Sequence, residues 1–268
     1  AVERARAEGL PALVATFDPH PVRYFRPDTP PFRLTSLNQR ERLFAEAGAD
    51  AMIVFPFNAA LAGLTAEEFV AERLSGVAGV VTGEDFTFGK GRSGNVAVLA
   101  ELGAKYGFIA EAVVPVTDGS GAISSSRIRD ALEIGDCPTA TRLLTRPFAV
   151  EGVVQHGEKN GRQLGFPTAN IEMGSYLRPR YGVYAVKGRL PDGRMLDGAA
   201  NLGIRPQFDP PREWLEPHFF DFSNDLYGQT VEVEFHAFIR PEAKFDSLEA
   251  LTTQIAQDCD RARALLAK

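Results

Sequence analysis

The sequence contains few of the residues that form disulfides or bind transition metals. Its 268 residues include two cysteines and four histidines. Cys137 and Cys259 lie far apart in the chain, without the close spacing of a metal-binding pair. The low number and wide spacing of the cysteines argue against a disulfide framework and fit a protein of the reducing cytoplasm.

Long apolar runs and an excess of basic residues are also missing. No apolar run approaches the length of a membrane span, and the charged start, residues 1–6, is not a signal peptide. The net charge is −6, with 14 basic and 18 acidic residues up to Thr145 and 15 and 17 after it. We therefore expect neither a membrane nor a nucleic-acid partner, because nucleic-acid-binding domains carry a basic excess.

Residues 1–145 alternate strand and helix signals, in a chain long enough for two domains. Short apolar runs typical of buried strands alternate with helical segments that begin at capping residues, such as Thr65. This alternation predicts an α/β domain with a parallel sheet and helices on both faces. The expected strands are 13–17, 51–55 and 77–82, and the expected helices are 2–8, 37–47 and 65–74.

The pattern changes near Pro147. Later segments are rich in Val, Tyr and Phe, are bounded by Gly and Pro, and alternate apolar with polar residues. They predict an antiparallel sheet, folded as a small β-barrel, over residues 146–268. Expected strands include 149–154, 182–187 and 230–239, and an amphipathic C-terminal helix is expected over 247–266.

The stretch from Gly157 to Asn170 carries the clearest chemical signal. Glycines let a backbone approach a ligand closely, and turn N–H groups with nearby cations suit phosphate oxygens. A glycine-rich hairpin without a ligand is the alternative, because the stretch matches neither common nucleotide-binding signature. The residues expected to hold phosphates are Gly157, Lys159, Gly161, Arg162 and Gly165.

Thr168 and Asn170 lie two residues apart, so an extended backbone points both side chains to one face. A hydroxyl and an amide oxygen side by side suit Mg²⁺, a hard cation that completes its shell with water and phosphate. The stretch therefore predicts a Mg-nucleotide site. Ordinary polar residues at a strand end are the alternative interpretation.

Phosphoryl transfer from ATP also needs a proton acceptor near the attacking hydroxyl. Glu216 lies in a strand-like stretch dominated by aromatic residues, where a carboxylate is expected to be partly desolvated. An edge-strand surface glutamate is the alternative. His156 and His218 are expected to be structural, because nothing pairs them with a nucleophile.

Six blocks in this half resemble the riboflavin kinase (flavokinase) family: 157–170, 179–186, 201–206, 215–222, 225–228 and 244–248. The resemblance implies that riboflavin and ATP are the substrates and that Glu216 is the catalytic base. It also implies ATP contacts at Leu226 and Tyr227, and flavin contacts at Arg180, Tyr181 and Asp246. Without it, residues 225–228 predict a turn, and Asp246 or Ser247 predicts a helix N-cap.

Three blocks in the first half, 16–21, 83–92 and 123–129, resemble the FMN adenylyltransferase module of the bacterial bifunctional riboflavin kinase/FAD synthetases. The whole chain is similar to that family, which implies a Rossmann-like nucleotidyltransferase domain at 1–145 and the kinase barrel at 146–268. Serines and arginines at a helix start would hold phosphates, whereas a simple helix cap is the alternative. The implied nucleotide or flavin contacts are Asp85, Phe86, Phe88, Arg92, Ser125, Arg127 and Arg129.

The chain departs from the family pattern at its start. The family opens with a Gly-x-Phe-Asp-Gly-x-His-x-Gly-His block that binds ATP phosphates, and this sequence has no such histidine pair. If the chain is the whole molecule, we expect weak or no FMN adenylylation; with the block supplied upstream, we expect the activity. Pro217 and Thr145 also differ from the family, and Pro217 removes a backbone donor.

These patterns predict an enzyme that phosphorylates riboflavin to FMN with Mg-ATP and, when intact, adenylylates FMN to FAD. A non-catalytic flavin- or nucleotide-binding module is one alternative. A nucleotidyltransferase for another phosphorylated substrate is a second. The barrel argues against the second, because the resemblance ties that module to flavokinases.

Overall fold

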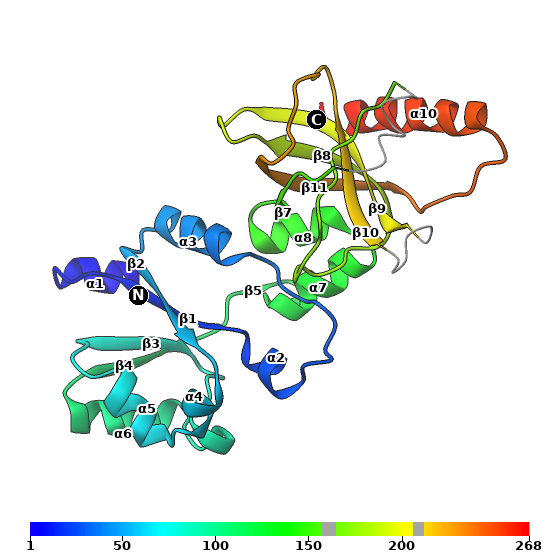
Figure 1. Ribbon diagram of the computed structural model, residues 1–268. Coiled ribbons are helices and arrows are strands. Elements are labelled where there is room, and N and C mark those ends of the chain that lie inside the picture. Colours follow the sequence, from blue (N-terminus) through cyan, green and yellow to red (C-terminus); the bar gives the residue numbers. More distant parts are fainter. Residues whose placement is uncertain (157–164, 206–211, 268) are drawn as a thin grey trace. The chain divides into compact units, whose positions relative to one another are not determined.

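The computed structural model describes residues 1–156, 165–205 and 212–267 (Figure 1). The chain forms two compact units, and each is described here by itself. The first unit comprises Ala1–Thr29 and Leu37–Ile123, and the second comprises Pro30–Ser36 and Ser124–Lys268.

The first unit contains parallel strand pairs, as predicted. Strand β1 (Leu13–Asp18) pairs with β2 (Ala51–Pro56), and β3 (Gly79–Gly83) pairs with β4 (Ile109–Val113). A small hairpin, β5 (Thr117–Asp118) and β6 (Gly121–Ala122), follows. The helices are α1 (Val2–Ala7), α2 (Pro21–Phe25), α3 (Leu37–Glu46), α4 (Ala59–Gly63), α5 (Ala66–Arg73), α6 (Val96–Tyr106) and the short 3₁₀ turn η1 (Lys90–Arg92).

Helix α5 shows how local sequence sets an element boundary. The Thr65 hydroxyl accepts the backbone N–H of Glu68, and the Glu68 carboxylate accepts the backbone N–H of Thr65. This reciprocal pair satisfies two donors at the helix start, which lies at Thr65 as the sequence predicted. The buried face of α5 places Phe69 and Val70 in the core of this unit, beside Leu99 of α6.

The second unit is built on a curled antiparallel sheet, which confirms the predicted barrel architecture. Its strand order is β10-β9-β8-β11-β7. Phe148, Tyr184 and Phe235, from three of these strands, are fully buried in its core. The strands are β7 (Phe148–Val153), β8 (Gly182–Arg189), β9 (Met195–Arg205), β10 (Arg212–Phe219) and β11 (Thr230–Arg240).

Two helices ahead of the sheet belong to the same compact unit. They are α7 (Ser125–Glu133) and α8 (Cys137–Leu144). The N–H of Arg180 donates to the carbonyl of Leu132 at the end of α7, over 3.0 Å. The unit therefore begins before the module boundary expected at 145/146, and that boundary stays a prediction.

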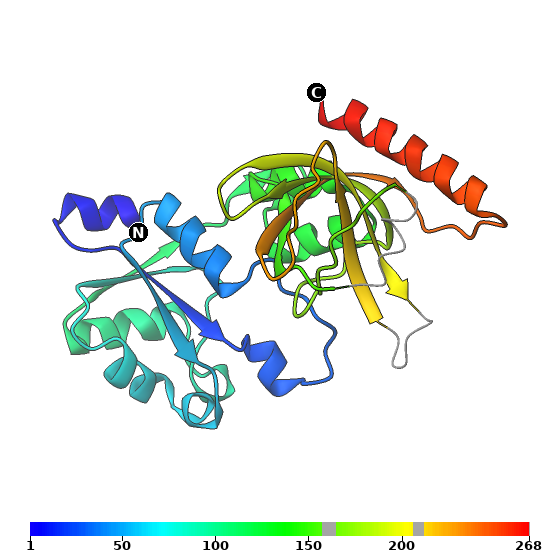
Figure 2. The ribbon, with the colours of Figure 1, turned by 45° about the horizontal axis from the view of Figure 1, so that its top comes forward.

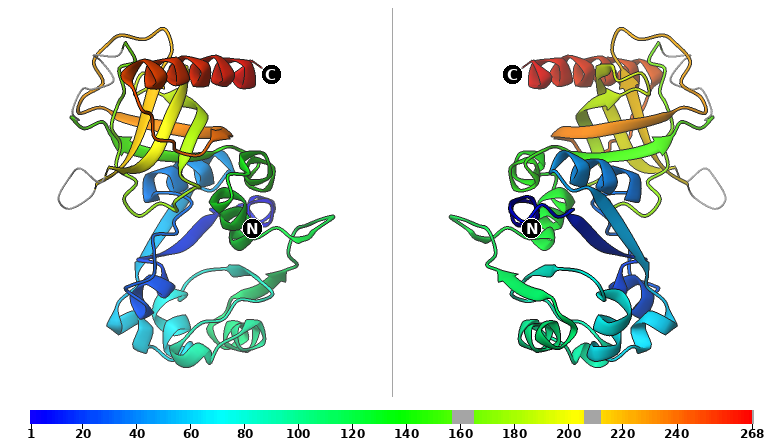
Figure 3. Two further views of the ribbon diagram at one scale, coloured as in Figure 1. Left: turned by 90° about the vertical axis from the view of Figure 1, so that its right-hand side faces the viewer. Right: turned by 90° about the vertical axis from the view of Figure 1, so that its left-hand side faces the viewer.

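The predicted C-terminal helix is α10 (Leu248–Leu266), and the side chain of Ser247 caps it by accepting the N–H of Ala250. It packs across β8, β9 and β11 (Figures 2 and 3). The guanidinium of Arg240, at the end of β11, donates to both carboxylate oxygens of the buried Asp258 on the helix. This pair ties α10 to the sheet.

Both cysteines are free and buried. Burial raises the pKa of the Cys137 thiol to about 12 and that of Cys259 to about 11. A thiol with such a pKa stays protonated at neutral pH, so these side chains act as packing groups rather than nucleophiles.

Candidate active site

The candidate site begins at residues 167–171, which run alongside strand β10. The N–H of Ile171 donates to the carbonyl of Leu215, and the N–H of Leu215 returns the bond, both over 2.9 Å. The N–H of Ala169 donates to the carbonyl of Pro217, also over 2.9 Å. The segment is therefore an antiparallel partner of β10 with a defined register.

That register places Asn170 directly opposite Glu216. Residues opposite each other in an antiparallel pair point to the same face, with Cβ atoms about 4.5–5.5 Å apart. Thr168 is opposite His218 by the same register, and it shares the face of Asn170 because it lies two residues away. The structure thus brings Thr168, Asn170 and Glu216 onto one face, as their predicted shared role requires.

Glu216 is partly withdrawn from water, with 19% of its side chain exposed. Sequence reasoning missed its partner, Arg205 at the end of β9, whose guanidinium donates to the Glu216 carboxylate. Arg205 also lies 3.3 Å from Glu242, and the Asn201 amide donates to the same Glu242 oxygen over 3.2 Å. The one signal available was the position of Arg205 in a family-like block, 201–206.

A cleft open to solvent lies beside residues 167–169. Thr168, Leu226 and Tyr227 all line it, so three residues expected to contact ATP meet at one cavity. Lining residues that the sequence did not single out include Val154, Phe219, Phe222, Ser223 and Asn224.

The turn predicted at 225–228 closes one side of the cleft. The Asp225 carboxylate accepts the N–H of Tyr227 over 2.9 Å, and Gly228 adopts a left-handed backbone with φ of 74°. The N–H of Gly228 donates to the carbonyl of Val154, which joins the turn to the end of β7. The ring of Tyr227 stacks on His156, with 3.9 Å between centroids.

Most of the predicted phosphate loop lies outside the described residues. These are Gly157, Lys159, Gly161 and Arg162. Gly165 is described, and its φ of 83° is a left-handed conformation that glycine adopts without strain.

The predicted flavin contacts lie around the sheet and α10. Arg180 stacks its guanidinium over Phe238, 4.7 Å from the ring centroid. The Tyr181 hydroxyl donates to Glu213 of β10 over 2.6 Å, and burial followed by this bond raises the pKa of Tyr181 to about 12. Asp246 is exposed, one residue before Ser247, so Ser247 and not Asp246 is the N-cap of α10.

Four of the predicted adenylyltransferase residues belong to the first unit. The rings of Phe86 and Phe88 stack, with centroids 5.4 Å apart, and Phe88 is buried in the core. Asp85 is exposed in the loop that follows β3. Arg92 has a φ of 57°, a left-handed conformation uncommon for a residue with a Cβ and frequent at functional loops.

The other three, Ser125, Arg127 and Arg129, lie on α7 in the second unit. The helix cap foreseen as the alternative is present: the hydroxyl of Ser124 accepts the N–H of Arg127 over 3.3 Å. Arg129 donates to the carbonyl of Phe32 over 2.9 Å and lies over its ring. Burial lowers the pKa of this guanidinium.

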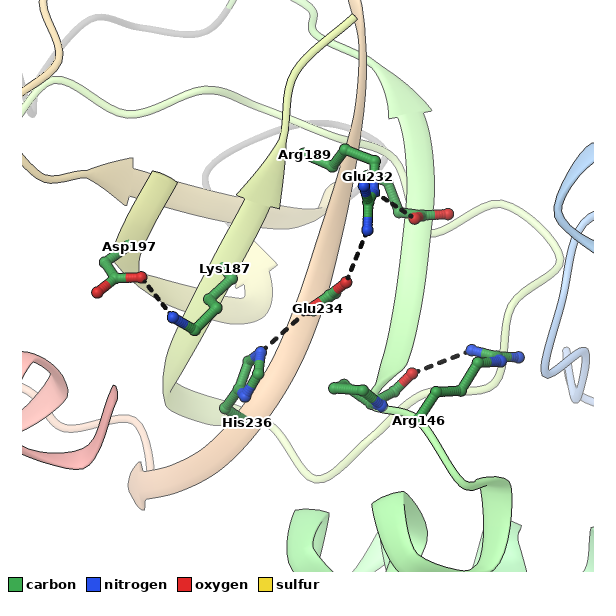
Figure 4. Close-up of polar contacts among 8 residues, drawn as sticks. Arg146, Lys187, Arg189, Asp197, Glu232, Glu234 and His236 are labelled. Carbon is green, nitrogen blue, oxygen red and sulfur yellow. Dashed lines mark hydrogen bonds and ion pairs between the residues drawn. The ribbon is translucent and has the colours of Figure 1, made fainter. Parts of the chain in front are cut away.

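A separate strip of charged side chains on the barrel is internally paired (Figure 4). Lys187 donates to Asp197 over 2.9 Å, and Arg189 lies 3.7 Å from both Glu232 and Glu234. His236 lies 3.1 Å from Glu234. These residues provide matched control positions for the site.

A parallel α/β unit, followed by an antiparallel barrel with an oxygen-rich edge beside an open cleft, defines a two-module, nucleotide-dependent transferase. The FAD synthetase family pattern matches residues 1–127, and the riboflavin kinase pattern matches residues 144–266. The chain belongs to the bifunctional riboflavin kinase/FMN adenylyltransferase family. This membership confirms the activities predicted from the sequence, riboflavin to FMN and FMN to FAD.

Individual relatives support the same family assignment. The bifunctional riboflavin kinase/FMN adenylyltransferase of Pseudomonas fluorescens is 41% identical over 99% of this chain and 86% of its own length. The enzyme of the same description from Escherichia coli K12 is 39% identical over 96% of this chain and 83% of its own. The high coverage of each chain means that the likeness extends through both modules.

A solved structure shares the fold along most of the chain. It is described as a macrolide-efflux protein from Streptococcus pneumoniae, with 32% identity and a TM-score of 0.86 over 97% of this chain and 86% of its own. In the part of our chain that the structure describes, no helix combines the length and the apolar character needed to cross a bilayer.

Proposed function

We propose that Glu216 is the general base of the riboflavin kinase reaction and that Thr168 and Asn170 hold the magnesium ion of Mg-ATP. The position of Asn170 directly opposite Glu216 carries this proposal. It puts a proton acceptor and two neutral oxygen ligands on one face of the pairing. Of these three residues, Thr168 lines the cleft, whose other lining residues include Ala169, Pro217 and Phe219 of the opposite face. Two neutral ligands suit Mg²⁺, which keeps water and phosphate oxygens in its shell.

In the proposed reaction, the ribityl 5′-hydroxyl of riboflavin attacks the γ-phosphorus of ATP. A new P–O bond forms to that oxygen while the bond to the β–γ bridging oxygen breaks, and ADP leaves with the electron pair. Glu216 accepts the hydroxyl proton, a role that typically contributes 10²- to 10⁴-fold in rate. A bound magnesium ion would supply charge neutralisation on the phosphates.

Arg205 gives Glu216 a fixed orientation for this step. A guanidinium binds a carboxylate in a defined geometry, and Glu242 holds the same guanidinium from its other side. The proton acceptor is therefore held in place by the structure before substrate binds.

The substrates are proposed to bind around this centre. The phosphates of ATP lie on the loop that contains Gly157, Lys159, Gly161, Arg162 and Gly165, and the adenosine lies toward Leu226 and Tyr227. Riboflavin lies toward Arg180, Tyr181 and Asp246. The shared cleft of Thr168, Leu226 and Tyr227 supports the ATP placement.

FMN adenylylation is proposed to use the remaining predicted residues. Ser125, Arg127 and Arg129 would hold phosphates at the start of α7, and Asp85, Phe86, Phe88 and Arg92 would contact nucleotide or flavin. The position of Ser125 and Arg127 in the first turn of α7 supports the first assignment, because a helix N-terminus favours negative charge. We propose the cytoplasm as the location, which the two free, buried cysteines support.

Incubation of the full chain with riboflavin, Mg²⁺ and ATP tests the proposal, with FMN and FAD resolved by chromatography. We expect FMN to form only when both ATP and Mg²⁺ are present. Flavin binding with no FMN under any metal condition would favour the non-catalytic binding module. FMN formation that is equally fast in excess chelator would contradict the metal role of Thr168 and Asn170.

A further inference from the structure

His218 makes a contact that neither the family resemblance nor the proposed chemistry uses. Its Nδ1 lies 2.8 Å from the carbonyl oxygen of Pro167, the residue immediately before Thr168. A carbonyl oxygen only accepts, so Nδ1 carries the proton and donates this bond. The donor side chain sits on β10, two residues after Glu216 and on the same face.

The backbone pairing explains why a side chain is needed at this point. The carbonyl of Pro217 accepts the N–H of Ala169, and in an antiparallel ladder the same residue would return its own N–H to the Ala169 carbonyl. Proline has no N–H, so that return bond is missing. Pro167 also lacks an N–H, so the end of the segment that carries Thr168 has weaker backbone pairing than the end at Ile171.

The imidazole ring is held in place by aromatic neighbours. Its centroid lies 5.5 Å from the ring of Phe166 and 5.9 Å from the ring of Phe220, with edge-on geometry to both. Phe220 is buried in the cluster that joins the sheet to Cys259 and Ala262 of α10, and Phe166 packs against that cluster. The ring is therefore an oriented donor rather than a free surface side chain.

We infer that His218 is a positioning residue for Thr168: its Nδ1–H bonds the carbonyl of Pro167, two residues before the Ala169 carbonyl that Pro217 cannot bond, and so holds the segment 167–168 against β10. The inference rests on the proposed metal role of Thr168. His218 does not touch the reacting atoms. It acts by keeping the Thr168 hydroxyl in register with Asn170 and Glu216.

The test is the Mg²⁺ concentration for half-maximal riboflavin kinase activity, with KM for Mg-ATP and kcat measured alongside. For His218→Leu we expect the half-activating Mg²⁺ concentration to rise about tenfold, with riboflavin affinity unchanged. His218→Asn, whose side-chain N–H lies near the position of Nδ1, should recover most of the wild-type value. His236→Leu is the matched control and should behave as wild type, because His236 belongs to the separate charged strip.

A second variant tests the reason for the contact. Pro217→Val supplies the missing backbone N–H, so in the His218→Leu background it should recover part of the lost Mg²⁺ affinity. Melting temperatures of all variants are measured in parallel, since a purely structural histidine would lower the melting temperature and leave the Mg²⁺ dependence unchanged. A lower melting temperature with unchanged Mg²⁺ dependence would overturn the inference. It would also be overturned if His218→Asn were as defective as His218→Leu.

Thr168→Ala separates failure of this inference from failure of the proposed metal site. If Thr168→Ala raises the Mg²⁺ requirement and His218→Leu does not, the positioning role is wrong and the metal assignment stands. If neither variant changes it, the metal assignment falls, and the positioning role falls with it.

Discussion

Asn170 and Glu216 face each other across the antiparallel pairing of residues 167–171 with strand β10. They are 46 positions apart in the chain, yet the hydrogen bonds on either side of them leave no freedom of register. A slip of one residue would send one of the two side chains to the opposite face. The predicted metal ligand and the predicted base therefore share a face only because of this pairing.

Replacement of the base tests its role directly. Glu216→Gln keeps the size and polarity of the side chain but cannot accept a proton, so we expect kcat for FMN formation to fall by roughly 10²- to 10⁴-fold. Riboflavin binding, followed by flavin fluorescence, should be retained. Glu232→Gln is the control, because Glu232 is similarly buried at 16% side-chain exposure and pairs with Arg189. Equal kcat values for wild type and Glu216→Gln would remove Glu216 from the mechanism.

Asn170 is expected to act through the metal. Asn170→Ala removes an oxygen ligand, and we expect the Mg²⁺ requirement of the kinase reaction to rise at least tenfold. Asn170→Asp retains an oxygen ligand that Mg²⁺ accepts, so its Mg²⁺ requirement should lie closer to that of wild type. A Mg²⁺ titration of initial rates separates the three proteins. If alanine and aspartate variants have the same requirement as wild type, Asn170 does not bind the metal.

Arg205 is expected to matter for turnover. In Arg205→Gln the Glu216 carboxylate loses its charged partner and its fixed orientation. We therefore expect kcat to fall about tenfold, which corresponds to a loss of roughly 1.4 kcal/mol in the stabilisation of the transition state. Steady-state kinetics with saturating riboflavin and Mg-ATP give this value. Arg189→Gln, which breaks only a pair in the separate charged strip, should leave kcat unchanged. A normal kcat for Arg205→Gln would mean that Glu216 is oriented by other groups.

The attachment of α10 should depend on Asp258. The Asp258 side chain is 6% exposed and accepts from Arg240 at both oxygens, so Asp258→Ala leaves the half-buried Arg240 guanidinium without this carboxylate. Breaking such a pair typically costs about 3–5 kcal/mol. Asp221→Ala is the contrasting variant: Asp221 pairs with Arg263 but is 85% exposed, and such pairs contribute about 0–1 kcal/mol. Urea denaturation of both variants measures the difference, which should clearly exceed experimental error.

The raised pKa of Tyr181 predicts that the folded protein loses stability at high pH. Burial and the bond to Glu213 raise its pKa from the ordinary value of 10 to about 12 in the folded protein. The unfolded chain therefore loses this proton first as the pH rises, so the stabilisation is present below about pH 10 and is lost between pH 10 and 12. The unfolding free energy of wild type should fall more steeply over this interval than that of Tyr181→Phe. Parallel slopes for the two proteins would contradict the prediction.

Local sequence was sufficient for the family and for several elements, but it did not predict others, such as α6 and β4. Thr65 with Glu68 and Ser247 ahead of an amphipathic run start helices by short-range hydrogen bonds, so their positions follow from neighbouring residues. The alternation of apolar and polar residues over β11 likewise identifies a half-buried strand, even when its neighbouring strands are not known. The Thr168–Asn170 pair was proposed because its residue types suit Mg²⁺ binding, and Glu216 was proposed because its residue type suits proton transfer and because the family resemblance supports that role.

What the sequence determined by itself was therefore the chemistry of single residues and the local geometry of each element. Only the tertiary structure decided which residues meet. It placed Arg205 against Glu216 and His218 against Pro167, and it assigned α7 to the compact unit that contains the barrel. These contacts depend on strand register and helix packing, which arise from many weak long-range interactions. These long-range interactions cannot be inferred from any short stretch of the sequence.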